Sequence, residues 1–270
     1  MISAPCLVMG VVNITPDSFS DGGRFLDEAA AVSHALGLVE AGADMLDIGG
    51  ESTRPGAEAV SAGDEIDRVL PVITALRRQT AIPISIDTMK PAVARAAVAA
   101  GASLWNDVSG LTWADDSLRT AADLGCDVVL MHMRGDPRTM QDDPRYDDVV
   151  ETVTTYLADR VEAAVAAGVR REAIWLDPGI GFGKRLAHNM ALLAHLDRLV
   201  GLGHRVLLGV SRKSFFRAID PSAASAGDRL PGSIAAALAG ARAGVTAVRV
   251  HDVRETLQAL RVQAAIDAAR

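Results

Sequence analysis

Residues 44–56 read Asp44-Met-Leu-Asp-Ile-Gly-Gly-Glu-Ser-Thr-Arg-Pro-Gly56, and the rest of the chain repeats the arrangement that begins here. The stretch opens as a short apolar strand, in which Leu46 and Ile48 are typical of buried positions and Asp47 lies between them. The two glycines that follow allow a sharp turn or the close approach of a ligand. Many α/β folds place their chemistry where a strand continues into a polar loop that contains glycine.

Short apolar runs alternate with longer, alanine-rich segments of helical period along the whole chain. The runs of strand type are residues 7–12, 45–48, 83–86, 103–105, 128–131, 174–176, 205–210 and 246–250. The segments of helical period are residues 27–40, 64–79, 91–100, 115–124, 147–167, 188–200, 232–243 and 253–268. Each apolar run is therefore followed by one segment of helical period, and this pairing occurs eight times.

Eight strand–helix units in a chain of 270 residues are typical of an eight-fold parallel barrel. A doubly wound open sheet is the competing architecture, because its units look the same locally. The count of eight favours the barrel, and no linker or low-complexity tract divides the chain. We therefore predict an α/β fold, a single-domain (β/α)8 TIM barrel over residues 1–270.

Composition and charge exclude several classes of protein. The net charge of −7 argues against a nucleic-acid-binding surface. Cys6 and Cys126 lie far apart in the sequence, so free thiols are expected rather than a disulfide or a metal pair. The N-terminus lacks a secretory signal, and no window approaches the roughly 18 apolar residues of a membrane span. These features predict a cytoplasmic protein without a nucleic-acid or membrane partner.

Polar side chains follow every predicted strand at its carboxyl end. In a parallel barrel these ends and the loops after them form one mouth, where active sites lie. A single acid there means little, because acids are common as turn residues and helix caps. Eight polar strand ends that converge on one mouth indicate a binding site. These ends are Asn13, Asp47, Asp87, Asn106 with Asp107, His132, Asp177, Ser211-Arg212-Lys213, and Arg249 with His251.

One set of these groups suits a flat, nitrogen-rich heterocycle. A carboxylate such as Asp177 can accept two N–H donors from the edge of an aminopyrimidine, as carboxylates do from guanidinium. Met131 and Phe182 could supply apolar faces for such a ring, although core packing is the commoner role of each residue type. The heterocycle set is Asp87, Asn106, Asp177 and Lys213.

A second set suits an anion, with phosphate or diphosphate as the best match. It consists of Asn13, Thr53, Arg54, Arg249 and His251. Arg249 and His251 alternate along the last strand, so both side chains face the same side. The oxygen of Asn13, together with diphosphate oxygens and waters, could hold Mg²⁺. No zinc motif, hydrolase elbow or dinucleotide fingerprint is present.

Two long motifs and several short ones resemble the dihydropteroate synthase family of pterin-binding enzymes. The long motifs are Met9-Gly-Val-Val-Asn-Ile-Thr-Pro-Asp-Ser-Phe-Ser-Asp-Gly-Gly23 and Asp47-Ile-Gly-Gly-Glu-Ser-Thr-Arg-Pro-Gly56. The short ones are Ser85-Ile-Asp-Thr88, Asn106-Asp107, Met131-His132, Asp177-Pro-Gly-Ile-Gly-Phe-Gly-Lys184, Ser211-Arg-Lys-Ser214 and Arg249-Val-His-Asp-Val253. The matches run nearly end to end and occur in order.

The resemblance implies a transferase of folate biosynthesis. Such enzymes condense 6-hydroxymethyl-7,8-dihydropterin diphosphate with 4-aminobenzoate to give 7,8-dihydropteroate and diphosphate. It also implies Mg²⁺ bound through Asn13 and a homodimer. The apolar faces of the last two helical segments could form the dimer interface or could face the barrel instead. The residues concerned are Ile234, Leu238, Leu257 and Leu260.

The resemblance also implies a role for each site residue. The pterin is expected on Asp87, Asn106, Met131, Asp177, Phe182 and Lys213. The diphosphate is expected on Asn13, Thr53, Arg54, Arg249 and His251, with Asp47 supporting them. The aminobenzoate is expected beside Pro55, Phe182, Lys213 and Ser214, and the catalytic residues are Asp87, Lys213, Arg249 and His251. A dissociative substitution at the pterin CH₂ is expected, with the polar loops 13–26 and 49–60 closing over the mouth.

Two alternatives stay open at this point. A pterin-dependent methyltransferase would share the pterin cradle but would not need the anion-binding Arg54, Arg249 and His251. A non-catalytic pterin-binding paralogue would be expected to lack Asn13, Lys213 or His251, and none of the three is missing.

Overall fold

The eight strands close into a parallel barrel in chain order, and β8 pairs with β1. The structure is a computed structural model that describes residues 6–14, 24–52, 59–135 and 139–269. The predicted TIM barrel is confirmed, and the open doubly wound sheet is excluded. The strands are β1 (Leu7–Asn13), β2 (Met45–Gly49), β3 (Ile84–Asp87), β4 (Leu104–Asp107), β5 (Asp127–Met131), β6 (Ile174–Asp177), β7 (Arg205–Gly209) and β8 (Ala247–Val250).

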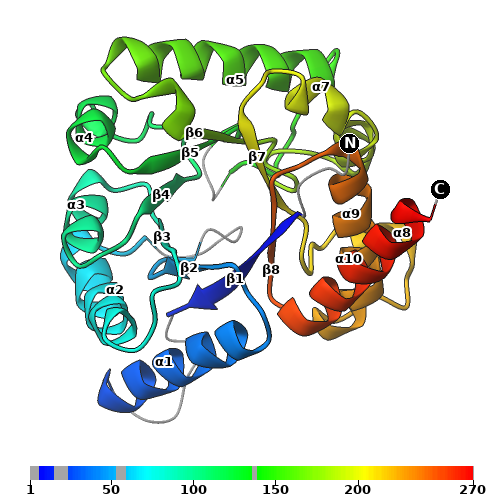
Figure 1. Cartoon of the computed structure of the whole chain (residues 1–270). Coiled ribbons are helices and arrows are strands. Elements are labelled where there is room, and N and C mark those ends of the chain that lie inside the picture. The colour runs from blue at the N-terminus through cyan, green and yellow to red at the C-terminus, as the bar shows by residue number, and fades with distance from the viewer. Residues whose placement is uncertain (1–5, 15–23, 53–58, 136–138, 270) are drawn as a thin grey trace.

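Helices form a ring around the barrel (Figure 1). They are α1 (Arg24–Glu40), α2 (Ala62–Arg77), α3 (Pro91–Ala99), α4 (Ser117–Leu124), α5 (Val149–Ala166), α6 (Leu186–Ala194), α7 (Leu196–Val200), α8 (Phe216–Ile219), α9 (Leu230–Ala243) and α10 (Val253–Ala268). Short 3₁₀ turns, η2 (Arg171–Ala173) and η3 (Gly227–Arg229), complete the described elements. None of the described helices is long and apolar enough to cross a membrane.

The structure differs from the sequence prediction at two helical segments. Residues 188–200, predicted as one helix, form α6 and α7, which are separated at His195. His195 has φ −124° and ψ 33°, outside the helical region, and no glycine or proline marks the break. Residues 217–230, for which the sequence predicts neither a strand nor a helix, contain most of α8 together with η3. Cys6 and Cys126 are free thiols, as predicted, and both are half-buried.

An apolar layer fills the interior of the barrel, and a second core lies between the barrel and its helices. The outer core is larger and includes Leu46, Ile48 and Trp105. The inner layer takes alternate residues from the strands, because successive side chains point to opposite faces. Its members are Met9, Met45, Leu104, Val129, Trp175, Leu207 and Ala247.

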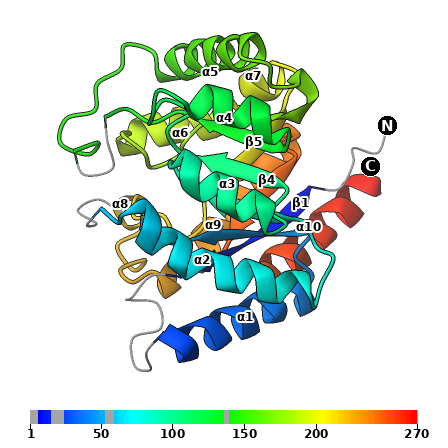
Figure 2. The same cartoon turned by 90° about the vertical axis from the view of Figure 1, so that its left-hand side faces the viewer.

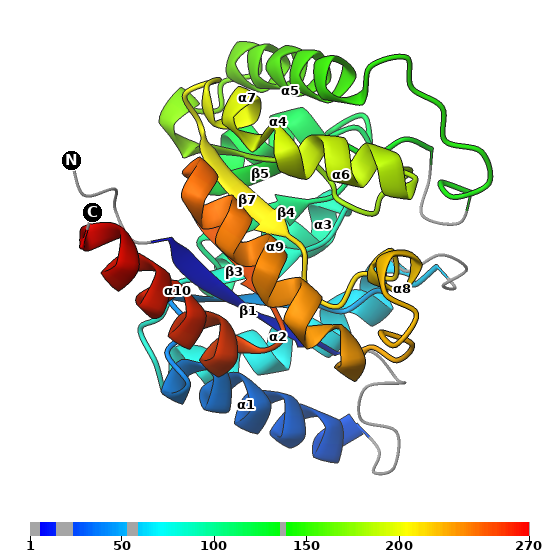
Figure 3. The ribbon, with the colours of Figure 1, turned by 90° about the vertical axis from the view of Figure 1, so that its right-hand side faces the viewer.

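The strand positions two residues after this inner layer form the next layer toward the mouth. Because alternation has a period of two, these residues also face the interior. They are Val11, Asp47, Asn106, Met131, Asp177, Gly209 and Arg249. In two side views, α8 lies at this carboxyl end and the last turn of α10 lies at the opposite end (Figures 2 and 3). The apolar layer therefore lies directly below this second layer on the same strands. We call the second layer the polar layer, because it carries Asp47, Asn106, Asp177 and Arg249.

Trp175 anchors the amino-terminal end of the interior. Its side chain is 3% exposed, and its Nε1–H donates to Asp127 Oδ2 at 3.0 Å. The Arg205 guanidinium lies 4.5 Å from the Trp175 ring centroid and pairs with the same carboxylate at 2.8 Å. Trp175 thus combines a large buried ring with a hydrogen bond and a cation–π contact.

Replacing Trp175 with alanine should lower the free energy of unfolding by about 3–5 kcal/mol, because it leaves a cavity and removes the hydrogen bond to Asp127. Urea denaturation followed by circular dichroism measures this loss. Trp113→Ala is the matched control, since Trp113 is 51% exposed, and it should change stability by less than about 0.5 kcal/mol. Equal losses in the two variants would contradict this role for Trp175.

Candidate active site

A buried ion network crosses the mouth between β8, β2, β3 and β4. Arg249 donates from Nε to Asp47 Oδ2 at 2.5 Å and from Nη2 to Asp87 Oδ2 at 2.8 Å. Asn106 Nδ2 donates to the same Asp47 oxygen at 3.2 Å. Since β1 lies between β8 and β2, the guanidinium reaches across β1 to both carboxylates. The structure therefore brings these four predicted residues together.

Charge balance in this network depends on Arg249. The Asp47 side chain is 0% exposed, and its Oδ1 has no hydrogen-bond partner among the described residues. Burial raises the pKa of Asp87 to about 7, although Arg249 lowers it. Burial alone would lower the pKa of Arg249, but Asp47 and Asp87 raise it above its usual range. Arg249 therefore keeps its positive charge while it holds two carboxylates.

Asp177 combines a structural contact with a position in the barrel interior. Its buried Oδ1 accepts the backbone N–H of Gly179 at 2.6 Å. Gly179 has φ +66°, and a Cβ atom there would lie 2.0 Å from the carbonyl oxygen of His132, so only glycine fits. Asp177 Oδ2 lies 3.8 Å from the place of an added Cβ at Gly209, on the neighbouring β7. Burial raises the pKa of Asp177.

Lys213 lies over the loop that follows β6. Its Nζ is 4.5 Å from the ring centroid of Phe182, which is a cation–π contact. Burial lowers the pKa of Lys213 to about 8, while the charge of Asp177 raises it and that of Arg249 lowers it further. Lys213, Phe182 and Asp177 thus lie close together at one corner of the mouth.

An apolar cluster borders the same corner. Met131 is 3% exposed and packs with Met89 and Val108, and Met133 and Phe182 lie against them. The sequence prediction included Met131 and Phe182 but missed the other three. Each missed residue lies two positions after an inward-facing strand end, so the period of two that identified the polar layer could have found them.

His251 is oriented by Ser211. The backbone N–H of His251 donates to Ser211 Oγ at 3.1 Å, and its ring Nδ1 lies 3.0 Å from the same oxygen. The adjacent Arg212 instead makes two hydrogen bonds to Asp252, at 3.0 Å and 2.6 Å. Of the three polar residues predicted after β7, Lys213 lies beside Phe182, Ser211 supports His251, and Arg212 forms an ion pair within the fold.

Asp107 has a structural role. The strand alternation turns it away from the interior, and its carboxylate accepts hydrogen bonds from Ser109 N and Oγ and from Leu111 N. Asp107 is fully buried, and this burial raises its pKa to about 7. It therefore stabilises the turn after β4 and does not face the site.

His132 and Lys184 join the loops after β5 and β6. Lys184 is 3% exposed, and its Nζ lies 2.9 Å from His132 Nδ1. It also donates toward the carbonyl oxygens of His132, Gly179 and Phe182, at 2.9 to 3.1 Å. Burial lowers the pKa of His132 to about 3 and that of Lys184 to about 7. The sequence prediction gave Lys184 no role, because its partners are apparent only once the two loops meet.

Asn13 places a neutral oxygen beside the ion network. Its Oδ1 lies 3.8 Å, and Asp87 Oδ2 lies 3.7 Å, from the place of an added Cβ at Gly49. The described residues contain no group of three or more His, Cys, Asp and Glu side chains that could hold a metal. A cation such as Mg²⁺ would therefore combine the Asn13 oxygen with oxygens of a bound substrate and of water.

Four predicted residues remain. Ser214 is exposed and lies two residues before α8. Thr53, Arg54 and Pro55 lie outside the described residues.

Comparison with known proteins identifies the family. The model of the family described as "Pterin binding enzyme" matches residues 9–251. Dihydropteroate synthase of Escherichia coli K12 is 45% identical over 258 residues, which cover 94% of this chain and 89% of that protein. Dihydropteroate synthase of Neisseria meningitidis is 47% identical and covers 96% and 92% of the two chains.

Solved structures agree with the sequence matches. The Xanthomonas albilineans dihydropteroate synthase with 4-aminobenzoic acid has a TM-score of 0.92 and 51% identity, covering 98% of this chain and 94% of that one. The same enzyme in complex with 7,8-dihydropteroate has a TM-score of 0.89 and 48% identity, with the same coverage. The chain belongs to the dihydropteroate synthase family of pterin-binding enzymes.

Proposed function

We propose that the chain condenses 6-hydroxymethyl-7,8-dihydropterin diphosphate with 4-aminobenzoate to form 7,8-dihydropteroate and diphosphate in folate biosynthesis. The observation that carries this proposal is the layer of buried acceptors, Asp87, Asn106 and Asp177, directly beside Lys213 and Arg249. Acceptors and cations at one end of one barrel suit a substrate that has a nitrogen-rich ring at one end and an anion at the other.

The pterin ring would lie on Asp87, Asn106 and Asp177. Only one oxygen of Asp177 is used by the loop backbone, so the other can accept N–H donors from the ring edge. Met131 and Phe182 belong to one apolar cluster, which supplies a surface for the flat face of the ring. Lys213, above Phe182, would donate to a ring acceptor.

The diphosphate would lie toward β8 and β1. Arg249 uses Nε and Nη2 for its carboxylates, which leaves Nη1 for a substrate oxygen. His251, held by Ser211, would donate to a second oxygen, and Thr53 and Arg54 would complete the anion site. Asn13 would bind Mg²⁺ together with the diphosphate, and the cation would neutralise the charge of the leaving group.

The aminobenzoate would lie beside Phe182, Lys213, Ser214 and Pro55, with its amine facing the pterin methylene. Its aromatic amine is a weak nucleophile, so the pterin CH₂–O bond should break largely before the C–N bond forms. Asp87 and Asp177 would stabilise positive charge on the pterin methylene, while Lys213, Arg249 and His251 would stabilise the departing diphosphate. This is a dissociative substitution, in which the amine loses its proton after the new bond forms.

A direct assay tests the function. Purified protein incubated with the pterin diphosphate, 4-aminobenzoate and Mg²⁺ should release equal amounts of dihydropteroate and diphosphate. Lys213→Met should lower kcat/KM about 100-fold or more, because one cation beside the reacting groups is lost. Arg217→Met is the control, since Arg217 is an exposed cation on α8. A folded wild-type protein that forms no product would exclude the proposed function.

The pH dependence of kcat/KM for the pterin diphosphate should be bell-shaped. Asp87, whose pKa is raised to about 7, must lose its proton to act as an acceptor, so activity rises with pH through that value. Lys213, whose pKa is lowered to about 8, must keep its proton, so activity falls above that value. Lys213→Arg should move the alkaline side of the profile to higher pH. An alkaline side that stays in place would remove Lys213 from this role.

We further propose that residues 1–270 act as one pterin-binding domain, in the cytoplasm, and as a homodimer. Leu260 is 8% exposed and belongs to the core, and Leu238 and Leu257 also pack against the core. The outer face of α9 and α10 presents Ile234, Val262 and Ile266, which border one surface hollow, and this face is the proposed interface. Val262 and Ile266 are 56% and 49% exposed.

A charge on this face should disrupt the homodimer. Val262→Asp combined with Ile266→Lys should give a monomer in light scattering after size exclusion, because desolvating two charges opposes association. Ile219→Lys is the matched control, since Ile219 is 55% exposed on α8. A dimer that persists in the double variant would place the interface elsewhere.

A further inference from the structure

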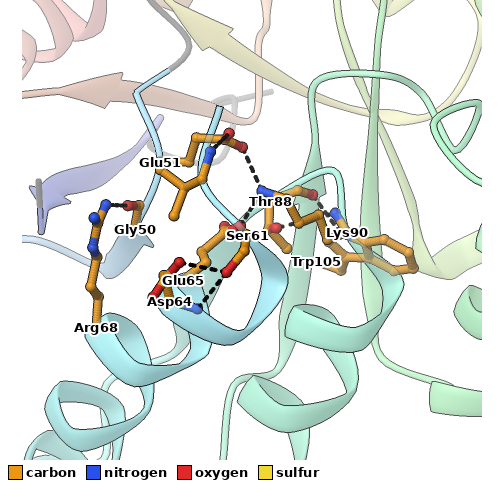
Figure 4. Close-up of polar contacts among 10 residues, drawn as sticks. Gly50, Glu51, Ser61, Asp64, Glu65, Arg68, Thr88, Lys90 and Trp105 are labelled. Carbon is orange, nitrogen blue, oxygen red and sulfur yellow. Dashed lines mark hydrogen bonds and ion pairs between the residues drawn. The ribbon is translucent and has the colours of Figure 1, made fainter. Parts of the chain in front are cut away.

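Lys90 lies between two buried carboxylates outside the site described above (Figure 4). Its Nζ donates to Glu51 Oε2 at 2.7 Å and to Glu65 Oε2 at 2.6 Å. The side chains of Lys90 and Glu51 are 13% and 11% exposed, and that of Glu65 is 0% exposed. The ammonium group and the two carboxylates thus contact one another and are largely shielded from water.

The three charged residues come from three different parts of the barrel. Glu51 lies two residues after β2, Glu65 lies in the first turns of α2, and Lys90 is the N-terminal cap of α3. Residues 50–61 form the β2–α2 loop. The contacts of Lys90 join the beginning of this loop to α2, which follows it, and to α3 in the next strand–helix unit. These separations in the sequence explain why the sequence analysis did not find the group.

Glu51 also connects the two ends of the β2–α2 loop to each other. Its Oε1 accepts the backbone N–H of Val60 at 2.8 Å. At the start of the loop, Arg68 of α2 donates to the carbonyl oxygen of Gly50 at 2.9 Å. At its end, Ser61 caps α2 by accepting the N–H of Asp64. Both ends of the loop are therefore fixed by side chains, and Glu51 contributes to both.

The Lys90 segment is itself rigidly attached to the pterin side of the site. The carbonyl oxygen of Thr88 accepts the indole N–H of Trp105 at 2.8 Å, and the Thr88 N–H donates to the carbonyl oxygen of Asn106 at 3.1 Å. Asp87 directly precedes Thr88. Lys90 thus connects the ends of the β2–α2 loop to the strand ends that carry Asp87 and Asn106.

We propose that Lys90 is a positioning residue, which acts with Glu51 and Glu65 to fix the ends of the β2–α2 loop relative to the pterin-binding strand ends. The inference rests on the proposed function, in which loop residues Thr53 and Arg54 bind the diphosphate. Groups that are held in place before substrate binds are preorganised, and preorganisation strengthens binding.

A simple stabilising role explains the arrangement less well. Buried ion pairs seldom stabilise a fold more than apolar side chains of similar size would. One of the carboxylates, Glu51, comes from the start of the loop and also accepts the backbone N–H of Val60 at its end, so the group does more than join two helices. The two roles predict different kinetics, because a lost stabilising contact does not by itself change substrate affinity in the folded protein.

Lys90→Met tests the proposal by removing the ammonium group while keeping a side chain of similar length. We expect KM for the pterin diphosphate and for 4-aminobenzoate to rise about tenfold and kcat to change less than about threefold, since binding rather than chemistry is weakened. Lys90→Arg should restore most of the affinity, because it keeps the charge between the two carboxylates.

Two further variants keep the test decisive. Lys90→Met with Glu65→Leu removes the cation and the most buried carboxylate together, so it should fold even if the single variant does not. Its KM values should rise as in the single variant. Arg205→Met breaks a partly buried ion pair at the opposite end of the barrel and should leave both KM values unchanged.

Hydrogen exchange gives a measurement that does not depend on activity. The Val60 amide should exchange slowly in the wild type, and at least tenfold faster in Glu51→Ala and in Lys90→Met, because its acceptor is lost or released. Arg205→Met should not change it. Unchanged KM values and unchanged Val60 exchange in folded Lys90→Met, or equal effects in Arg205→Met, would overturn the proposal. A wild type without activity but with a protected Val60 amide would instead reject the proposed function alone.

Discussion

A fully buried carboxylate requires a cation close by, and Arg249 meets that requirement for Asp47 while also holding Asp87. Removing one partner of such a buried pair costs about 3–5 kcal/mol. The guanidinium connects β8 to β2 and β3 across β1, so it adds a side-chain connection to the backbone pairing of β8 with β1 that closes the barrel. The same side chain belongs to the proposed anion site.

This arrangement has a chemical consequence for the proposed reaction. In the absence of substrate, three carboxylates and two cations lie near one another, and much of the positive charge of Arg249 and Lys213 is balanced by protein groups. An incoming diphosphate must share those cations with Asp47, Asp87 and Asp177. Binding therefore depends on groups already fixed in place, which is the condition for strong electrostatic stabilisation of a leaving group.

The fold and the inward-facing site residues could be predicted from the sequence because both follow from strand periodicity. Asp47, Asn106, Asp177 and Arg249 were found at strand ends, and their common face follows from the period of two. The break at His195 carries no local signal.

The structural role of Asp107, the contacts of Lys184 and the group around Lys90 could not be predicted. They depend on side chains that meet across separate loops, and a single sequence contains no information on which loops touch. Thr53, Arg54 and Pro55 were predicted for the site but lie outside the described residues, so their part in it stays a prediction.

The stacking of an apolar layer and a polar layer on the same strands limits how this protein can evolve. Inserting or deleting one residue between Trp175 and Asp177, or between Ala247 and Arg249, would turn the second residue toward the helices while the first stayed inside. Such a change would bury an unpaired charge in the outer core. It would also remove Asp177 or Arg249 from the site. Loops can change length without this penalty, so sequence change in the family should be tolerated in loop length and selected against in strand length.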